Sequence, residues 1–88
     1  MANIASQIKR NRQNEKARLR NQAARSEMKT AARQALEAGE SGDAEAAGEA
    51  LRKAQRTIDR AVSSGVLHRN TAARRKSRLG RQVKSLLG

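Results

Sequence analysis

The chain has no cysteine, no proline and no aromatic residue among its 88 positions, and it has a single histidine. Without cysteine, neither a disulfide framework nor a thiolate metal site can form. Without Phe, Tyr or Trp, the stacking platforms on which most single-strand binders hold bases are excluded. No apolar run approaches the ~20 residues of a membrane-spanning helix. One histidine and eight acids predict no metal site, no cofactor and no catalytic centre, so we expect a binding protein rather than an enzyme.

Positive charge is what the sequence has in excess. The formal net charge is +12, from 20 Lys and Arg against 8 Asp and Glu. Residues 1–26 hold seven cations against Glu15 alone, a net of +6, and residues 60–88 hold eight cations and no acid, a net of +8. Solvated helix faces are the simplest explanation of a charge run, but such faces usually carry compensating acids. The two uncompensated segments therefore predict two surfaces that bind a polyanion, and we favour nucleic acid.

The first expected helix is the longest. Nothing breaks a helix between Asn3 or Ser6, either of which could cap it, and Gly39, which we expect to end it. Large apolar residues are sparse in its first half. We therefore expect a single domain over residues 1–88 in which a basic helical extension, residues 1–25, projects from a bundle formed by residues 26–88.

Two shorter helices are expected after the first, which predicts an all-α, three-helix bundle. Asp43 is the expected N-cap of the second helix, Gly65 can adopt the left-handed conformation that ends it, and Asn70 is the expected N-cap of the third. Gly80 lies within the third helix, where it costs ~1 kcal/mol relative to Ala unless it permits close packing. The residues expected on the buried sides are Ala47, Leu51, Ala54, Ile58 and Ala61/Val62, followed by Ala72/Ala73, Leu79/Gly80, Val83 and Leu86/Leu87.

His68 has two interpretations. A lone histidine next to a turn is commonly a local capping residue, and it could equally make a polar contact to a phosphate or a sugar. As a metal ligand or an acid–base catalyst it lacks a neighbour of the right type in the sequence. Both of the first two interpretations remain open at this stage.

Some other classes of protein share features with this sequence. The segment 69–78 is similar to a bZIP basic region, but a zipper needs several heptads and only Leu79 and Leu86 follow at that spacing. Transit peptides and membrane-surface helices need a broader apolar face than residues 1–20 offer. A small basic nucleoid-type DNA-binding protein is the remaining alternative, although no helix-turn-helix or dimerisation signal supports it.

Several motifs, in order and spacing, resemble those of the bacterial small-subunit ribosomal protein S-twenty family. The resemblance covers the whole chain, and its most distinctive part is the segment 65–77. The matching residues are Met1-Ala2-Asn3-Ile4, Ser6, Lys9-Arg10, Glu15-Lys16-Ala17-Arg18, Asn21, Arg25-Ser26, Met28-Lys29-Thr30, Ala38-Gly39-Glu40, Gly42-Asp43, Gly65-Val66-Leu67-His68-Arg69-Asn70, Ala72-Ala73-Arg74 and Lys76-Ser77.

The resemblance implies a three-helix bundle with an extended first helix, and a cytoplasmic place in the small (30S) ribosomal subunit. It implies direct binding of 16S-type ribosomal RNA, at the 5′ domain and at the long helix near the 3′ end, and bridging of RNA helices during assembly. Few protein contacts, no membrane and no homo-oligomer are expected. The implied RNA contacts are Asn3, Lys9, Arg10, Arg12, Lys16, Arg18, Arg20, Asn21, Arg25 and Lys29, then His68, Arg69, Asn70, Arg74, Arg75, Lys76, Ser77 and Arg78.

Overall fold

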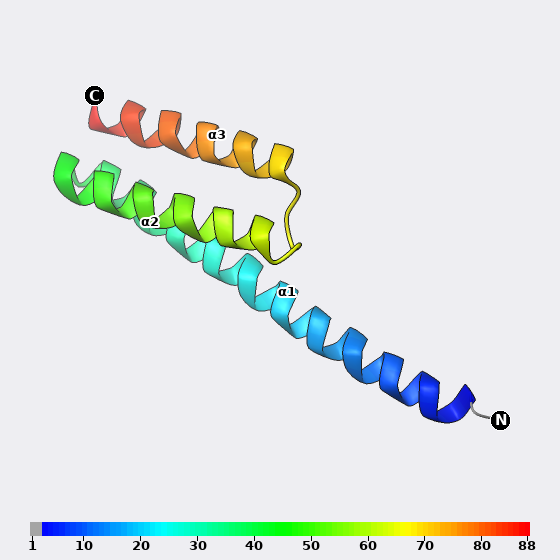
Figure 1. Ribbon diagram of the computed structural model, residues 1–88. Coiled ribbons are helices and arrows are strands. Elements are labelled where there is room, and N and C mark those ends of the chain that lie inside the picture. The colour runs from blue at the N-terminus through cyan, green and yellow to red at the C-terminus, as the bar shows by residue number, and fades with distance from the viewer. Residues whose placement is uncertain (1–2) are drawn as a thin grey trace.

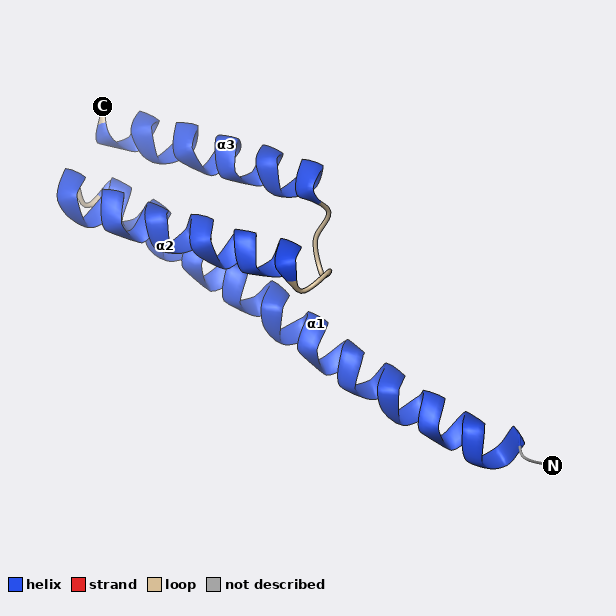
Figure 2. Ribbon diagram, in the orientation of Figure 1, coloured by secondary structure: helices blue, strands red, loops and turns tan. Residues whose placement is uncertain are grey.

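Three helices make up the fold, as the sequence predicts. The computed structural model describes residues 3–88, and within that range it contains α1 (Asn3–Glu40), α2 (Ala44–Ser63) and α3 (Arg69–Leu87) and no strand. The helices run up, down and up, and α1 packs against both of the others (Figures 1 and 2). The all-α, three-helix prediction with a long N-terminal helix is confirmed.

The described chain is elongated because α1 continues far past its neighbours. Its 38 residues, at ~1.5 Å each, make a rod of about 57 Å. The principal extents are 65 × 22 × 13 Å and the radius of gyration is 17.5 Å, against about 12 Å for a compact domain of this length. Figure 1 shows the start of α1 extending away from the two shorter helices.

We call residues 4–23 the projecting segment, because none of its side chains is buried. Its three large apolar residues are well exposed: Ile4 at 64%, Ile8 at 48% and Leu19 at 52%. The first buried residue of α1 is Met28. The sparse apolar pattern of the first half therefore predicted its lack of a core correctly.

The core is built mainly from alanine. One cluster gathers Ala31 and Ala35 of α1, Ala47 and Ala54 of α2, and Leu79 and Val83 of α3. A second cluster joins Met28 to Ile58, Ala61 and Ala72. Because helix separation depends on the side chains at the contact, methyl groups let the three backbones approach closely. Larger side chains that are only partly buried, such as Leu36 and Leu51, pack against the first cluster, and Val62, Val66 and Leu67 pack against the second.

The first helix ends later than the sequence suggested. Gly39 does not stop it, since α1 continues through Glu40, and the chain turns at Gly42, whose φ is +79°. Gly39 is buried, and a Cβ added there would lie 3.3 Å from Cβ of Leu86. This glycine serves close packing of α1 against α3 rather than termination. Ser6 lies inside the helix and does not cap it, and the side chain of Asn3 is outside the described part.

Both expected ends of α2 are confirmed. A carboxylate oxygen of Asp43 accepts hydrogen bonds from the backbone N–H groups of Glu45 and Ala46, each at 3.1 Å. At the other end Gly65 takes the left-handed conformation, with φ +80°. Its N–H donates to the carbonyl of Val62, and the N–H of Val66 donates to that of Ala61. These two bonds are the Schellman pattern that satisfies carbonyls at a helix end.

The buried side of α3 is narrower than predicted. Ala72, Leu79 and Val83 are buried, but Ala73, Leu86 and Leu87 are exposed, so their predicted burial is wrong. Successive helix positions are 100° apart, so Ala73 is turned away from the row formed by Ala72, Leu79 and Val83. Leu86 lies against Gly39 of α1 but belongs to the last turn of α3, and it is still 43% exposed.

Candidate nucleic-acid interface

The first predicted surface follows α1. Its side chains are exposed, except for that of Asn21, which is half-buried. One acid compensates for it: Glu15 accepts hydrogen bonds of 2.6 and 3.3 Å from the guanidinium of Arg18. The other acid of this part, Glu27, pairs with Arg60 of α2 at 3.6 Å. We call the following residues the rod surface: Lys9, Arg10, Arg12, Lys16, Arg18, Arg20, Asn21, Arg25 and Lys29.

Four members of the rod surface gather on one face of α1. Arg18, Asn21, Arg25 and Lys29 line a shallow hollow together with Asn14. Steps of three and four residues place them above one another on a helix. Arg10 continues this face four residues before Asn14, whereas the other four cations, Lys9, Arg12, Lys16 and Arg20, lie on the opposite side of the helix. Positive charge therefore surrounds much of the helix instead of forming a single band.

The second predicted surface begins at the turn after α2 and continues along α3. Its side chains are exposed apart from Lys76, which is half-buried. Among residues 3–88, Arg69, Arg74, Arg75 and Arg78 take part in no ion pair. We call the following residues the turn surface: His68, Arg69, Asn70, Arg74, Arg75, Lys76, Ser77 and Arg78.

His68, not Asn70, is the N-cap of α3. Nδ1 of His68 accepts a hydrogen bond of 3.1 Å from the backbone N–H of Asn70. The predicted capping role of Asn70 is wrong because the helix begins at Arg69, two residues earlier than a cap at Asn70 would place it. An accepting Nδ1 leaves the proton of a neutral imidazole on Nε2. A neutral His68 can therefore cap α3 through Nδ1 and donate a hydrogen bond to a ligand through Nε2, so the two interpretations of His68 are compatible.

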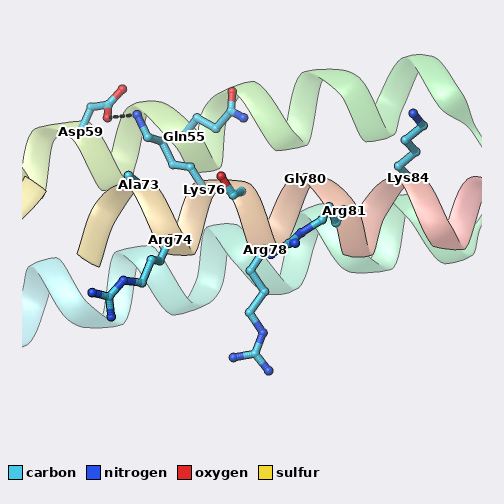
Figure 3. A pocket seen from close by; sticks show the side chains of 10 residues that line it. Gln55, Asp59, Ala73, Arg74, Lys76, Arg78, Gly80, Arg81 and Lys84 are labelled. Carbon is cyan, nitrogen blue, oxygen red and sulfur yellow. Dashed lines mark hydrogen bonds and ion pairs between the residues drawn. The ribbon is translucent and has the colours of Figure 1, made fainter. Parts of the chain in front are cut away.

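Lys76 differs from its neighbours because it has an internal counter-ion. Its Nζ donates to a carboxylate oxygen of Asp59 on α2 at 2.8 Å (Figure 3). Figure 3 also shows Arg74 and Arg78 directed away from α2. The pair fastens α3 to α2 and compensates the charge of Lys76 locally. The arginines keep their charge available for a partner.

The structure brings together a groove that the sequence did not reveal. Gln55 and Asp59 of α2 line it with residues of α3 that include Gly80, Arg81 and Lys84. Arg81 and Lys84 continue the basic face of α3 at helical spacing, which the sequence could have indicated. The contribution of Gln55 has no such signal, because it depends on how α2 packs against α3. Three further exposed cations, Arg52, Lys53 and Arg56, lie on α2 beside Gln34.

The amino-acid sequence matches that of a known protein family. The family model described as "Ribosomal protein S20" matches residues 2–84. The chain belongs to the ribosomal protein S20 family. The resemblance carried by the motifs is therefore confirmed, and a member of this family is a structural protein rather than an enzyme.

Curated relatives of this S20 family member match it from end to end. The small ribosomal subunit protein bS20 of Streptomyces griseus is 59% identical over 86 residues, covering 98% of each chain. That of Streptomyces avermitilis is 58% identical over 88 residues, covering all of both chains. The protein of the same name from Beutenbergia cavernae is 58% identical over 86 residues. The family assignment thus rests on the full length and not on one motif.

The described part of this S20 family member forms neither a metal centre nor a membrane span. Within residues 3–88, no three His, Cys, Asp or Glu side chains come together as metal ligands would. No helix in that range has an apolar stretch long enough to cross a bilayer. The chemistry that the described residues do offer is hydrogen-bond donation and positive charge, presented from rigid helices.

Proposed function

We propose that the chain is a structural protein of the small (30S) ribosomal subunit that binds 16S-type ribosomal RNA directly. The observation that carries this proposal is the rod surface, a set of exposed cations on more than one side of a continuous helix of 38 residues. The names of its relatives, small ribosomal subunit protein bS20, agree with it. The expected cellular place is the cytoplasm, without homo-oligomers and with few protein contacts.

Affinity in this proposal comes mainly from phosphate. Cations that neutralise phosphates release condensed counterions, which is favourable and depends on salt. Arginine adds bidentate hydrogen bonds to phosphate and planar stacking, which lysine cannot supply. The deep groove of A-form RNA is closed to side chains, so shape and backbone contacts dominate. Most cations of both surfaces are arginines, which suits this mode of binding.

The N-terminal end of the rod surface is far enough from the turn surface to hold a different piece of RNA. Met28 packs in one cluster with Ala72, so the start of α3 lies beside Met28 of α1. Lys9 lies 19 residues earlier, about 28 Å along the helix axis. We infer that the basic extension, residues 1–25, binds one RNA segment while the bundle, residues 26–88, binds another through the turn surface. The 5′ domain and the long helix near the 3′ end are the expected segments, held together during assembly.

Footprinting on 16S-type ribosomal RNA tests the bridging. Each of two triple substitutions should uncover a different RNA segment and leave the other at least partly protected. Each should also lower the salt dependence of binding, by up to ~0.9 in slope for every phosphate of duplex-like RNA that is no longer neutralised. If both uncover the same nucleotides, the protein has one continuous site and does not bridge. The rod triple changes Lys9, Arg10 and Arg12 to Gln, and the turn triple changes Arg74, Arg75 and Arg78 to Gln.

A third triple controls for the decrease in net charge. It removes three exposed cations of α2 that belong to neither surface. It should reduce non-specific binding in the same way as the others but uncover neither segment. Disappearance of either footprint in this variant would mean that net charge, and not the two surfaces, determines binding. The control triple changes Arg52, Lys53 and Arg56 to Gln.

A further inference from the structure

The groove between α2 and α3 is a separate feature from the exposed rod. Gln55 and Asp59 form its α2 side, and Gly80 lies on its α3 side next to Arg81, with Lys84 about one turn farther along α3 (Figure 3). Its α3 side extends from Ala73 to Lys84. That is about 16 Å of helix at ~1.5 Å per residue, long enough for a few nucleotides of an extended strand.

The groove has a positive surplus that the protein itself does not compensate. Asp59 is the one acid that lines it, and Lys76 already pairs with this carboxylate at 2.8 Å. Arg81 and Lys84 take part in no ion pair within residues 3–88. The charge of Asp59 is thus compensated by Lys76, and the other cations of the groove can bind a ligand. A polyanionic ligand fits this distribution of charge.

Packing within the protein does not explain why a glycine occupies position 80, inside α3. A glycine inside a helix costs ~1 kcal/mol relative to alanine, and a Cβ built at Gly80 meets no heavy atom within 4 Å apart from its chain neighbours and the backbone of its own helix. Gly39 differs, since a Cβ there meets Leu86 at 3.3 Å. Close packing within the chain therefore accounts for Gly39 and does not account for Gly80. A glycine also lets the backbone of a ligand approach the helix closely.

We propose that a sugar–phosphate strand of RNA lies along the α2–α3 groove, closest to the protein at Gly80. Arg81 and Lys84 bind its phosphates, and the side-chain amide of Gln55 donates to a phosphate or 2′-hydroxyl oxygen. This inference rests on the proposed binding of ribosomal RNA and extends the turn surface, four of whose residues also line the groove, onto α2 and toward the end of α3. Neither the rod surface nor the turn surface includes α2.

A matched pair of glycine substitutions tests the groove. Gly80→Gln fills its floor without changing charge, and Gly48→Gln introduces the same side chain on α2, where the nearest atom to an added Cβ is Nη2 of Arg52 at 3.8 Å. Both changes should raise the urea midpoint of the free protein, because Gln is the better helix former. On in vitro transcribed small-subunit ribosomal RNA, Gly80→Gln should weaken binding at least tenfold, while Gly48→Gln should stay within twofold of wild type.

Two charge variants keep the test decisive if Gly80→Gln disturbs the fold. Arg81→Gln and Lys84→Gln should each lower the salt slope by up to ~0.7 to 0.9 and expose the same short stretch of nucleotides. If the wild type binds this RNA and these variants and Gly80→Gln all match it, the groove proposal is wrong while the proposed function stands. If the wild type itself does not bind the RNA, both fail.

Discussion

The projecting segment and the bundle are both helical, but different forces hold them. In the bundle, Ala35, Ala47 and Ala54 are at most 1% exposed, and the helices support one another. In the projecting segment no side chain is buried, and cations follow each other with Glu15 as the one acid. Helix in the first case follows from packing, and in the second from propensity and from continuity with the bundle.

The comparison shows how a small protein can position charge without a core beneath it. Starting a helix is unfavourable, whereas extending one costs little per residue. The buried half of α1 provides that start, so residues 4–23 only extend an existing helix. Repulsion between like charges on successive turns costs tenths of a kcal/mol per pair. An RNA ligand would remove this repulsion.

Hydrogen exchange should separate the two regions most strongly. In the free protein, amides of residues 5–20 should exchange at least a hundredfold faster than those of Ala31 and Ala35 in the same helix, because opening free energies follow local packing. Ribosomal RNA should then protect residues 5–20. Equal protection along all of α1 in the free protein would show that the projecting segment does not depend on a partner for order.

Shortening one leucine in each region should give the next largest difference. Leu79→Ala removes a side chain that is 5% exposed, and it should lower the free energy of unfolding by about 2–4 kcal/mol. Leu19→Ala removes one that is 52% exposed, and it should change the same quantity by less than ~0.5 kcal/mol. Urea unfolding followed by circular dichroism measures both. A large destabilisation by Leu19→Ala would reveal that the projecting segment packs against something that the structure does not show.

A capping change sharpens the contrast at a smaller scale. His68→Ala removes the acceptor at the start of α3 and should cost about 1 kcal/mol of stability, while His68→Asn should restore most of it. Ser6→Ala, in the projecting segment, should change stability by less than ~0.5 kcal/mol because Ser6 lies within α1. If Asn fails to replace His68, the imidazole contributes more than a cap.

The smallest expected difference concerns two ion pairs. Asp59 and Lys76 join α2 to α3, whereas Glu15 and Arg18 lie three residues apart in one helix. Ion pairs at least partly exposed to solvent contribute about 0.2–1 kcal/mol, less in high salt. Asp59→Asn should lower the unfolding midpoint of the bundle, whereas Glu15→Gln should leave it unchanged because its pair lies in the projecting segment, where no side chain is buried. A double-mutant cycle with Lys76→Gln isolates the tertiary interaction, and zero coupling would contradict it.

Local chemistry made the helices and two of their ends predictable. Asp43 and Gly65 behave as expected because an N-cap oxygen and a left-handed glycine act within a few residues. Gly39 and Gly42 could not be told apart as stops, since the close approach of Leu86 to Gly39 is visible only in the packed structure. His68 is the cap of α3 because its ring nitrogen accepts a hydrogen bond from the backbone N–H of Asn70.

The candidate site also has one part that the sequence predicts and one part that depends on how the helices pack. The two basic surfaces were predictable because exposure and charge on a single helix follow from spacing alone, and Arg81 and Lys84 extend that spacing. The groove was not predictable, because Gln55 reaches it only through the packing of α2 on α3. Whether an interior glycine is free or packed, as at Gly80 and Gly39, likewise requires the neighbouring helix.

The unbroken run of α1 from Asn3 to Glu40 fixes the phase as well as the reach of its charges. Each residue of an α-helix adds 100° of rotation and ~1.5 Å of length. Inserting one residue between the projecting segment and Met28 would turn every earlier cation by 100° relative to the bundle. Inserting four would return them to within about 40° of their original direction, displaced by ~6 Å. The direction in which these cations point and their distance from the bundle are therefore coupled, because an insertion of a few residues in α1 changes both.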